Sequence, residues 1–140
     1  MTEELLQYIW EHALFEKKDL VTTNSDPIEI LNPGTRNTDA GPDFFNASIK
    51  IGKTLWAGNV EVHVQSSDWI THGHQNDQSY NNVILHVVLN NNKIIAQNGN
   101  EIIPVFIPKV KPEVIENYSH LIAQKSWPAC YETIGKINPI

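Results

Sequence analysis

Apolar residues recur at helical spacing near the start of the chain and predict an amphipathic helix over residues 3–16. Thr2 is the expected N-cap, and Glu3 and Glu4 suit the positive end of the helix dipole. The apolar face comprises Leu5, Leu6, Ile9, Trp10, Ala13 and Leu14. Residues 22–42 are rich in Asn, Thr, Asp, Pro and Gly, with residues 28–31 as a possible short strand. Such a long polar loop in a small domain is often functional.

Two alternating segments then predict a β-hairpin across the Gly52-Lys53 turn. In residues 44–51 the apolar face holds Phe45, Ala47, Ile49 and Ile51. In residues 54–65 the apolar face holds Trp56, Gly58, Val60, Val62 and Val64, and the polar face holds Asn59, Glu61, His63 and Gln65. A two-residue turn pairs Ile51 with Thr54, so Asp43 faces Val62 and lies on the opposite side from Glu61. A bend at Gly41-Pro42, or a bulge for which Gly58 is the expected site, would bring the carboxylates together.

The remaining segments predict a short helix or structured loop, a buried strand, a second hairpin and a closing helix. Residues 69–80 follow a helix start at Ser67-Asp68, and residues 82–89 are nearly all apolar, as in a strand covered on both faces. Residues 93–97 and 101–107 flank Asn98-Gly99, and Pro104 makes the second of these strands an edge. Pro112 opens the last helix, whose core side holds Ile115, Tyr118 and Ile122. This order predicts an α+β (α/β) fold with helices packed on a mixed sheet, in one domain over residues 1–140.

Composition and charge narrow the class of protein. The 140 residues are 41% hydrophobic and 19% charged, which suits one globular domain. The single cysteine, Cys130, excludes an intrachain disulfide and a cysteine-based zinc site. No basic signal segment opens the chain and no apolar run is long enough for a membrane span, so we expect a cytoplasmic protein without a membrane partner. The net charge of −6 argues against binding nucleic acid mainly through overall positive charge. An acidic nuclease centre is compatible with this net charge.

Side chains that could take part in catalysis or metal binding are concentrated between residues 41 and 86. Asp43 follows a sharp Gly-Pro turn at the start of a predicted strand. Glu61 and His63 share one face of the next strand, because side chains alternate between the two faces. Further candidates within reach of that strand are His72, His74, Asp77, Tyr80 and His86. Two carboxylates beside a proton-handling group are what metal-assisted phosphodiester hydrolysis requires, since hard oxygen ligands hold Mg²⁺ or Mn²⁺.

The order Pro42-Asp43, then Glu61-Val62-His63 after 18 residues, with a helix and a buried strand following, resembles the PD-(D/E)XK nuclease core. The resemblance implies that Asp43, Glu61 and the backbone carbonyl of Val62 bind Mg²⁺ or Mn²⁺, with nucleic acid as substrate. His63 stands where that family has a lysine that orients the attacking water. A neutral imidazole orients water differently from an ammonium, so this position departs from the pattern.

A second resemblance covers most of the chain. It rests on Asn32-Pro33-Gly34, Gly41-Pro42-Asp43-Phe44, Ser67-Asp68-Trp69 and Val83-Ile84-Leu85-His86-Val87-Val88. These runs closely resemble a bacterial family of proteins of unknown function, numbered 2851. Its members are longer, which implies that the chain is the N-terminal part of a protein whose C-terminal region is missing here. This resemblance implies no activity.

Each of these residues also has a purely structural interpretation. Asp43 would cap a turn, and Glu61 would be a solvated cross-strand partner. Histidines 72 and 74 would be exposed loop residues, and His86 a hydrogen-bonded core residue. Arg36, the one arginine in the chain, would contact an anion or lie on the surface.

Two further functional hypotheses stay open beside the nuclease. The first is a site for Zn²⁺, Fe²⁺ or Mn²⁺ made by Glu61 and the histidines at 63, 72, 74 and 86. The second is a non-enzymatic interaction domain that uses the polar strand face. A closed β-barrel would favour the histidine site, and an open sheet with helices on it would favour the nuclease.

Overall fold

An open mixed β-sheet forms the centre of the computed structural model, which describes residues 1–118. Its strands are β1 (Ile28–Asn32), β2 (Thr35–Arg36), β3 (Phe44–Ile51), β4 (Thr54–Gln65), β5 (Val83–Asn90) and β8 (Val105–Phe106). They lie in the order β1-β3-β4-β5-β8, and β2 pairs with β3 beside β1. β1, β3 and β4 are antiparallel neighbours, whereas β5 and β8 run parallel to β4. The α+β fold with a mixed sheet is confirmed, and within the described residues the sheet does not close into a barrel.

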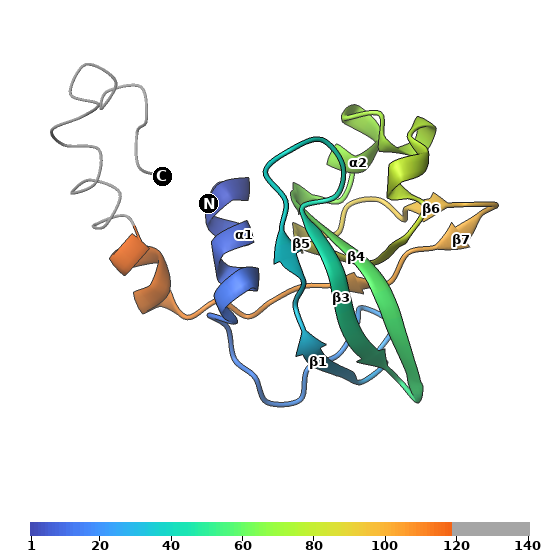
Figure 1. The fold of residues 1–140 in the computed structure, drawn as a ribbon. Helices are drawn as coiled ribbons and strands as arrows, with labels where there is room; N and C mark the ends of the chain where they lie inside the picture. The colour runs from blue at the N-terminus through green and yellow to red at the C-terminus, as the bar shows by residue number, and fades with distance from the viewer. Residues whose placement is uncertain (119–140) are drawn as a thin grey trace, which may run out of the picture.

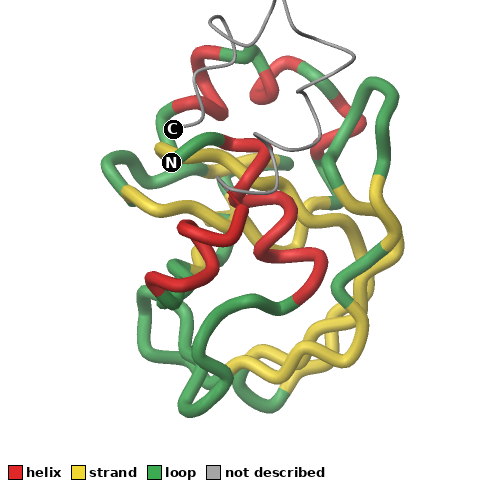
Figure 2. Tube along the Cα trace, turned by 90° about the vertical axis from the view of Figure 1, so that its left-hand side faces the viewer, coloured by secondary structure: helices red, strands yellow, loops and turns green. Residues whose placement is uncertain are grey.

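Helices lie on two sides of this sheet (Figure 1). On one side is α1 (Glu3–His12), and on the other are α2 (Asp68–Thr71) and the short 3-10 helices η1 (His74–Asn76) and η2 (Gln78–Tyr80). Figure 2 shows α1 in front of the strands when the molecule is viewed from that side. The α1 side holds the main hydrophobic core, to which β4 and β5 contribute Val60, Val62, Leu85 and Val87. A smaller apolar cluster comprises Trp69, Tyr80, Val83, Ile95 and Ile103.

The first helix begins as predicted and ends early. Thr2 Oγ1 accepts a hydrogen bond from the Leu5 backbone N–H at 3.1 Å, which confirms the N-cap. The helix stops at His12 instead of residue 16, because Ala13 adopts a left-handed conformation with φ of 53°. Its N–H closes the helix on the carbonyls of Ile9 and Trp10. Phe15 is thereby free to form a β-bridge with Val110.

The second hairpin is shorter than predicted, because its second strand divides at Pro104. Only β6 (Ala96–Gln97) and β7 (Glu101–Ile102) pair across the Asn98-Gly99 turn, as a separate two-stranded sheet. After Pro104 the chain joins the main sheet as β8, at the far edge from β1. The Pro104 carbonyl accepts a hydrogen bond from the His86 N–H at 2.9 Å.

The closing helix is described over residues 112–118, where Ile115 and Tyr118 pack against the main core as predicted. Ile122, Cys130 and the tail at residues 136–140 lie outside the described residues. In the described part, no helix is long and apolar enough to cross a bilayer.

Candidate functional site

A β-bulge in β3 brings Asp43 and Glu61 together. The predicted register holds from the pair Ile51–Thr54 to the pair Ala47–Gly58, and then slips so that Phe44 pairs with Val60. Asp43 therefore stands opposite Glu61, and the predicted placement opposite Val62 is wrong. The slip occurs around Asn46, whose φ of 62° is left-handed, and not at Gly58 as predicted.

The same slip corrects the predicted apolar face of β3, whereas on β4 Val60 and Val62 are buried as predicted. Phe44, and not Phe45, is buried together with Ala47 and Ile49, because the extra residue reverses the alternation at the start of β3. Trp56 is 48% exposed near the hairpin tip and does not join the core.

Asn46 offers a direct test of this geometry. Asn46→Val places a β-branched side chain at positive φ and should lower the free energy of unfolding by about 1–2 kcal/mol. Asn46→Gly, which tolerates that conformation, should stay within about 1 kcal/mol of the wild type. Urea denaturation measures both values, and Lys50→Val, at an exposed position of the same strand, is the matched control. An Asn46→Val variant as stable as the wild type would contradict the assigned bulge.

Backbone hydrogen bonds hold the two carboxylates against each other. The Asp43 N–H donates to Glu61 Oε1 at 3.0 Å, and the Val62 N–H donates to Asp43 Oδ2 at 2.9 Å. Gln7 of α1 also hydrogen-bonds Asp43, and its Oε1 accepts from Arg36 Nη2 at 2.6 Å. The Asp43 carboxylate thus reaches across to β4. Its turn is tied instead by Asn37, whose Nδ2 donates to the carbonyls of Asp39, Ala40 and Pro42.

Burial makes this pair electrostatically unfavourable when no cation compensates it. Glu61 is only 4% exposed, so it is not a solvated surface residue. Burial first, and then the charge of Asp43, raise the pKa of Glu61 to about 10. Burial also raises the pKa of Asp43, against the hydrogen bond from Val62. Ionising both carboxyl groups therefore requires a nearby positive charge.

Two histidines, His63 and His74, lie beside Oε2 of Glu61, and a third, His86, contacts His63 from behind. Glu61 Oε2 lies 2.9 Å from His74 Nε2 and 3.3 Å from His63 Nε2. On its other side, His63 Nδ1 lies 2.8 Å from Nε2 of His86, which is fully buried. Burial is the largest cause that lowers the pKa of His63 to about 2, of His74 to about 4 and of His86 to about 3. All three imidazoles are therefore neutral at neutral pH.

An aromatic layer fixes the position of His74. Tyr80 stacks on its ring, with centroids 3.7 Å apart and an interplanar angle of 13°. Trp69 packs edge-on against both His74 and His86. Gln97 Nε2 donates to the His74 carbonyl at 3.0 Å. Tyr80 thus acts as a packing residue, and Gln97 is a support that the sequence pattern did not reveal.

Of the other predicted site residues, His72 lies near the histidine cluster, whereas Asp77 and Arg36 bind other partners. His72 is exposed, yet its ligand atom and those of His63 and His74 all lie within 4.8 Å of one another. Asp77 is exposed and accepts hydrogen bonds from the Ser79 backbone N–H and hydroxyl, which lower its pKa. Arg36 contacts α1: its Nη2 donates to Gln7 Oε1, and its Nη1 lies 3.8 Å from Glu11 Oε1.

Glu3 is the acidic residue that sequence reasoning missed. Its Oε1 lies 3.9 Å from His63 Nε2, and its charge contributes to the raised pKa of Glu61. In the sequence, its place in the first turn of a helix was already explained by the helix dipole. Only the packing of α1 on the sheet directs it to this site.

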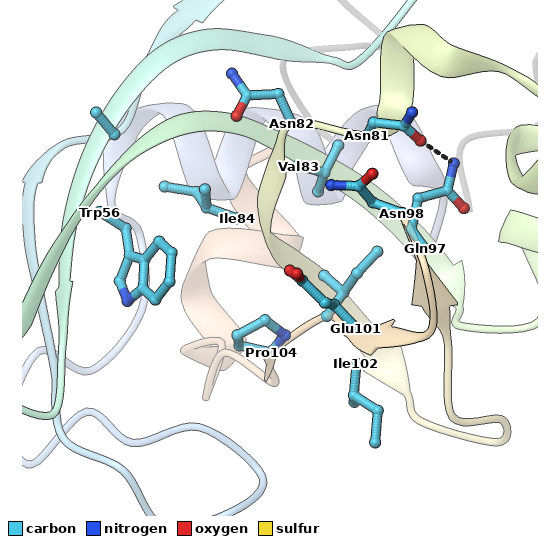
Figure 3. Close-up of a pocket in the computed structure, with 12 residues that line it drawn as sticks. Trp56, Asn81, Asn82, Val83, Ile84, Gln97, Asn98, Glu101, Ile102 and Pro104 are labelled. Carbon is cyan, nitrogen blue, oxygen red and sulfur yellow. Dashed lines mark hydrogen bonds between the residues drawn. The ribbon is translucent and has the colours of Figure 1, made fainter.

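A cavity of about 380 Å³ lies apart from the carboxylates (Figure 3). Trp56, Ile84 and Pro104 line one part of it, and Asn81, Gln97 and Asn98 line another. Asn81 Oδ1 accepts a hydrogen bond from Gln97 Nε2 at 3.0 Å. None of the predicted site residues lines this cavity.

Comparison with known proteins places the chain in one family. No curated protein and no solved structure matches it significantly. The family model described as "Protein of unknown function (DUF2851)" matches residues 3–140. Because that match spans nearly the whole chain, the family resemblance seen in the sequence is confirmed, and this chain belongs to the DUF2851 family.

Proposed function

We propose that this domain hydrolyses phosphodiester bonds in nucleic acid with the help of a divalent metal ion. The observation that carries the proposal is the placement of half-buried Asp43, just before β3, opposite buried Glu61 of β4. Such a pair satisfies the first requirement of a nuclease centre of the PD-(D/E)XK kind. The strand arrangement adds support, because an antiparallel pair carries the carboxylates and a parallel buried strand follows.

The residues present fit a divalent cation. Asp43 and Glu61 supply hard oxygen ligands of the kind that Mg²⁺ and Mn²⁺ prefer, and the Val62 N–H donates to Asp43 Oδ2. Burial raises the pKa of both carboxyl groups, so a cation would favour their ionised forms. A bound cation would supply Lewis acidity toward the phosphoryl group and make water a better nucleophile at neutral pH.

The chain's own residues would do the positioning. The Val62 N–H and Gln7 orient the Asp43 carboxylate, and the Asp43 N–H orients Glu61. His63, in the position where the nuclease pattern has lysine, adjoins Glu61 Oε2. Trp69 and Tyr80 pack against the histidines and restrict water from that side. This preorganisation is what electrostatic catalysis requires.

The test is a cleavage assay with the full chain. After removal of metal by a chelator, single-stranded and double-stranded DNA and RNA are incubated with Mg²⁺ or Mn²⁺. We expect cleavage that depends on the metal and falls by more than about 100-fold in Asp43→Asn, since even outer-shell partners of a metal contribute 10–100-fold. Asp39→Asn, in the exposed loop before Asp43, should match the wild type.

A folded wild type that cleaves none of these substrates with either metal would overturn the proposal. Cleavage that persists in excess chelator would also overturn it. The inert outcome would leave the interaction domain as the better interpretation.

A further inference from the structure

We propose that the metal at this site is a transition metal of the zinc and manganese class, held by Glu61 together with His63, His72 and His74 rather than by the Asp43 and Glu61 carboxylates alone, and that Mg²⁺ is a poor substitute. This inference rests on the proposed metal role of Glu61 and specifies its cation. The observation behind it is the convergence of three imidazole nitrogens within 4.8 Å of one another beside Glu61 Oε2.

The distances from Glu61 Oε2 to His63 and His74 are near those between ligands of one ion. Zinc binds imidazole nitrogen and carboxylate oxygen at about 2.0–2.2 Å, so two ligands at the tetrahedral angle stand about 3.3–3.5 Å apart. Glu61 Oε2 lies 3.3 Å from His63 Nε2 and 2.9 Å from His74 Nε2. Both distances are close to that spacing, so Glu61 Oε2 and these two nitrogens are placed to share one ion.

A buried nitrogen without a partner points into the cluster. His63 is 1% exposed, and its Nε2 has no hydrogen-bond partner among the described residues, although Glu61 Oε2 is near. Leaving such a group unpaired is costly, and a metal ion would use its lone pair. His86 supports this role. When His63 Nδ1 carries the proton and donates it to His86 Nε2, the lone pair of His63 Nε2 is free to coordinate a metal.

The remaining two histidines occupy complementary places. His74 is buried and clamped by Tyr80, so it is a preorganised ligand. His72 follows α2 and is exposed, so it lies on the solvent side of the cluster. Water and substrate would therefore reach the cluster from the side of His72.

The ligand types decide which metal is favoured. Imidazole suits zinc, iron and copper, whereas Mg²⁺ binds oxygen and keeps much of its water shell. With one carboxylate and three imidazole nitrogens, this cluster provides few of the oxygen ligands that Mg²⁺ prefers. Affinity at nitrogen-containing sites also rises from Mn²⁺ to Zn²⁺.

Calorimetric titration of the metal-free full chain with Zn²⁺, Mn²⁺ and Mg²⁺ tests the inference. We expect one Zn²⁺ bound more tightly than Mn²⁺, and both more tightly than Mg²⁺. His72→Gln and His74→Gln should each weaken Zn²⁺ binding at least about 10-fold, since outer-shell changes alone reach that size. Both should leave Mg²⁺ binding unchanged. His12→Gln, on the exposed end of α1, is the matched control and should bind all three ions as the wild type does.

His74 is packed beneath Tyr80, so circular dichroism should accompany its variant; His72 is exposed and its variant tests coordination without that concern. Equal affinity for Mg²⁺ and Zn²⁺ in the wild type would overturn the inference. Zn²⁺ affinity unchanged in His72→Gln would do the same. Neither result depends on nucleic-acid cleavage, so this inference and the proposed function fail separately.

Discussion

Glu61→Gln is expected to abolish metal binding and metal-dependent cleavage together. The substitution keeps the shape of the side chain and removes a carboxyl group whose Oε2 lies beside His63 and His74 and whose Oε1 accepts from the Asp43 N–H. An amide cannot balance a cation in a site that is 4% exposed. We expect a loss of more than about 100-fold in metal affinity, because a ligand should matter more than the outer-shell partners that contribute 10–100-fold. Calorimetric titration and the cleavage assay measure the two losses.

The same variant should behave oppositely in stability when a chelator removes metal. The pKa of Glu61 is raised to about 10 in the folded chain and is 4.5 in its ordinary state. The carboxyl group therefore stabilises the fold below the unfolded pKa, and this contribution is lost as pH rises toward the folded one. Glutamine loses no proton, so the free energy of unfolding of the wild type should fall relative to that of Glu61→Gln between about pH 5 and about pH 9.

The controls separate charge from structure. Glu29→Gln makes the same chemical change at an exposed position of β1 and should alter neither metal binding nor the pH dependence. Saturating metal should reverse the order of stability, because it stabilises only the chain that binds it. A Glu61→Gln variant with wild-type metal affinity would rule out Glu61 as a ligand.

Gly58→Ala should destabilise the fold by about 1–3 kcal/mol, the cost of overpacking a filled site. A Cβ at this position would lie 2.5 Å from Ile84 Cγ2 and 2.7 Å from the Asn82 carbonyl oxygen. That carbonyl accepts a hydrogen bond from the Asn59 N–H, which joins β4 to the segment before β5. The extra methyl group would therefore push apart the two strands that carry Glu61, His63 and His86. Metal affinity should fall with stability.

A double-mutant cycle identifies the cause. Ile84→Ala removes one of the two contacts, so Gly58→Ala should cost less in that background than in the wild type. Gly52→Asn is the control, since its position is open and asparagine tolerates the left-handed conformation there. Urea denaturation gives each free energy of unfolding. Equal costs of Gly58→Ala in both backgrounds would show that Ile84 is not the obstacle.

Local pattern was sufficient where neighbouring residues alone decide the structure. The N-cap at Thr2, the bounds of β3 and β4, and the pair Ile51–Thr54 were predicted correctly because capping and two-residue turns are short-range effects. The helix end and the division of the second hairpin were missed. They depend on Phe15 pairing with Val110 and on Val105 pairing with His86, which are distant in sequence.

The sequence by itself determined which chemical groups the domain can offer: one carboxylate after Pro42, a glutamate and a histidine on one strand face, and three more histidines nearby. The tertiary structure alone decided which of them meet. The left-handed Asn46 shifts the strand register and sets Asp43 opposite Glu61. Parallel pairing of β4 with β5 places Glu61 opposite His86, and the segment that connects them returns His72 and His74 to the same face while leaving Asp77 outside. A one-residue slip reverses every side chain beyond it, so no local pattern could fix the site before the strands were paired.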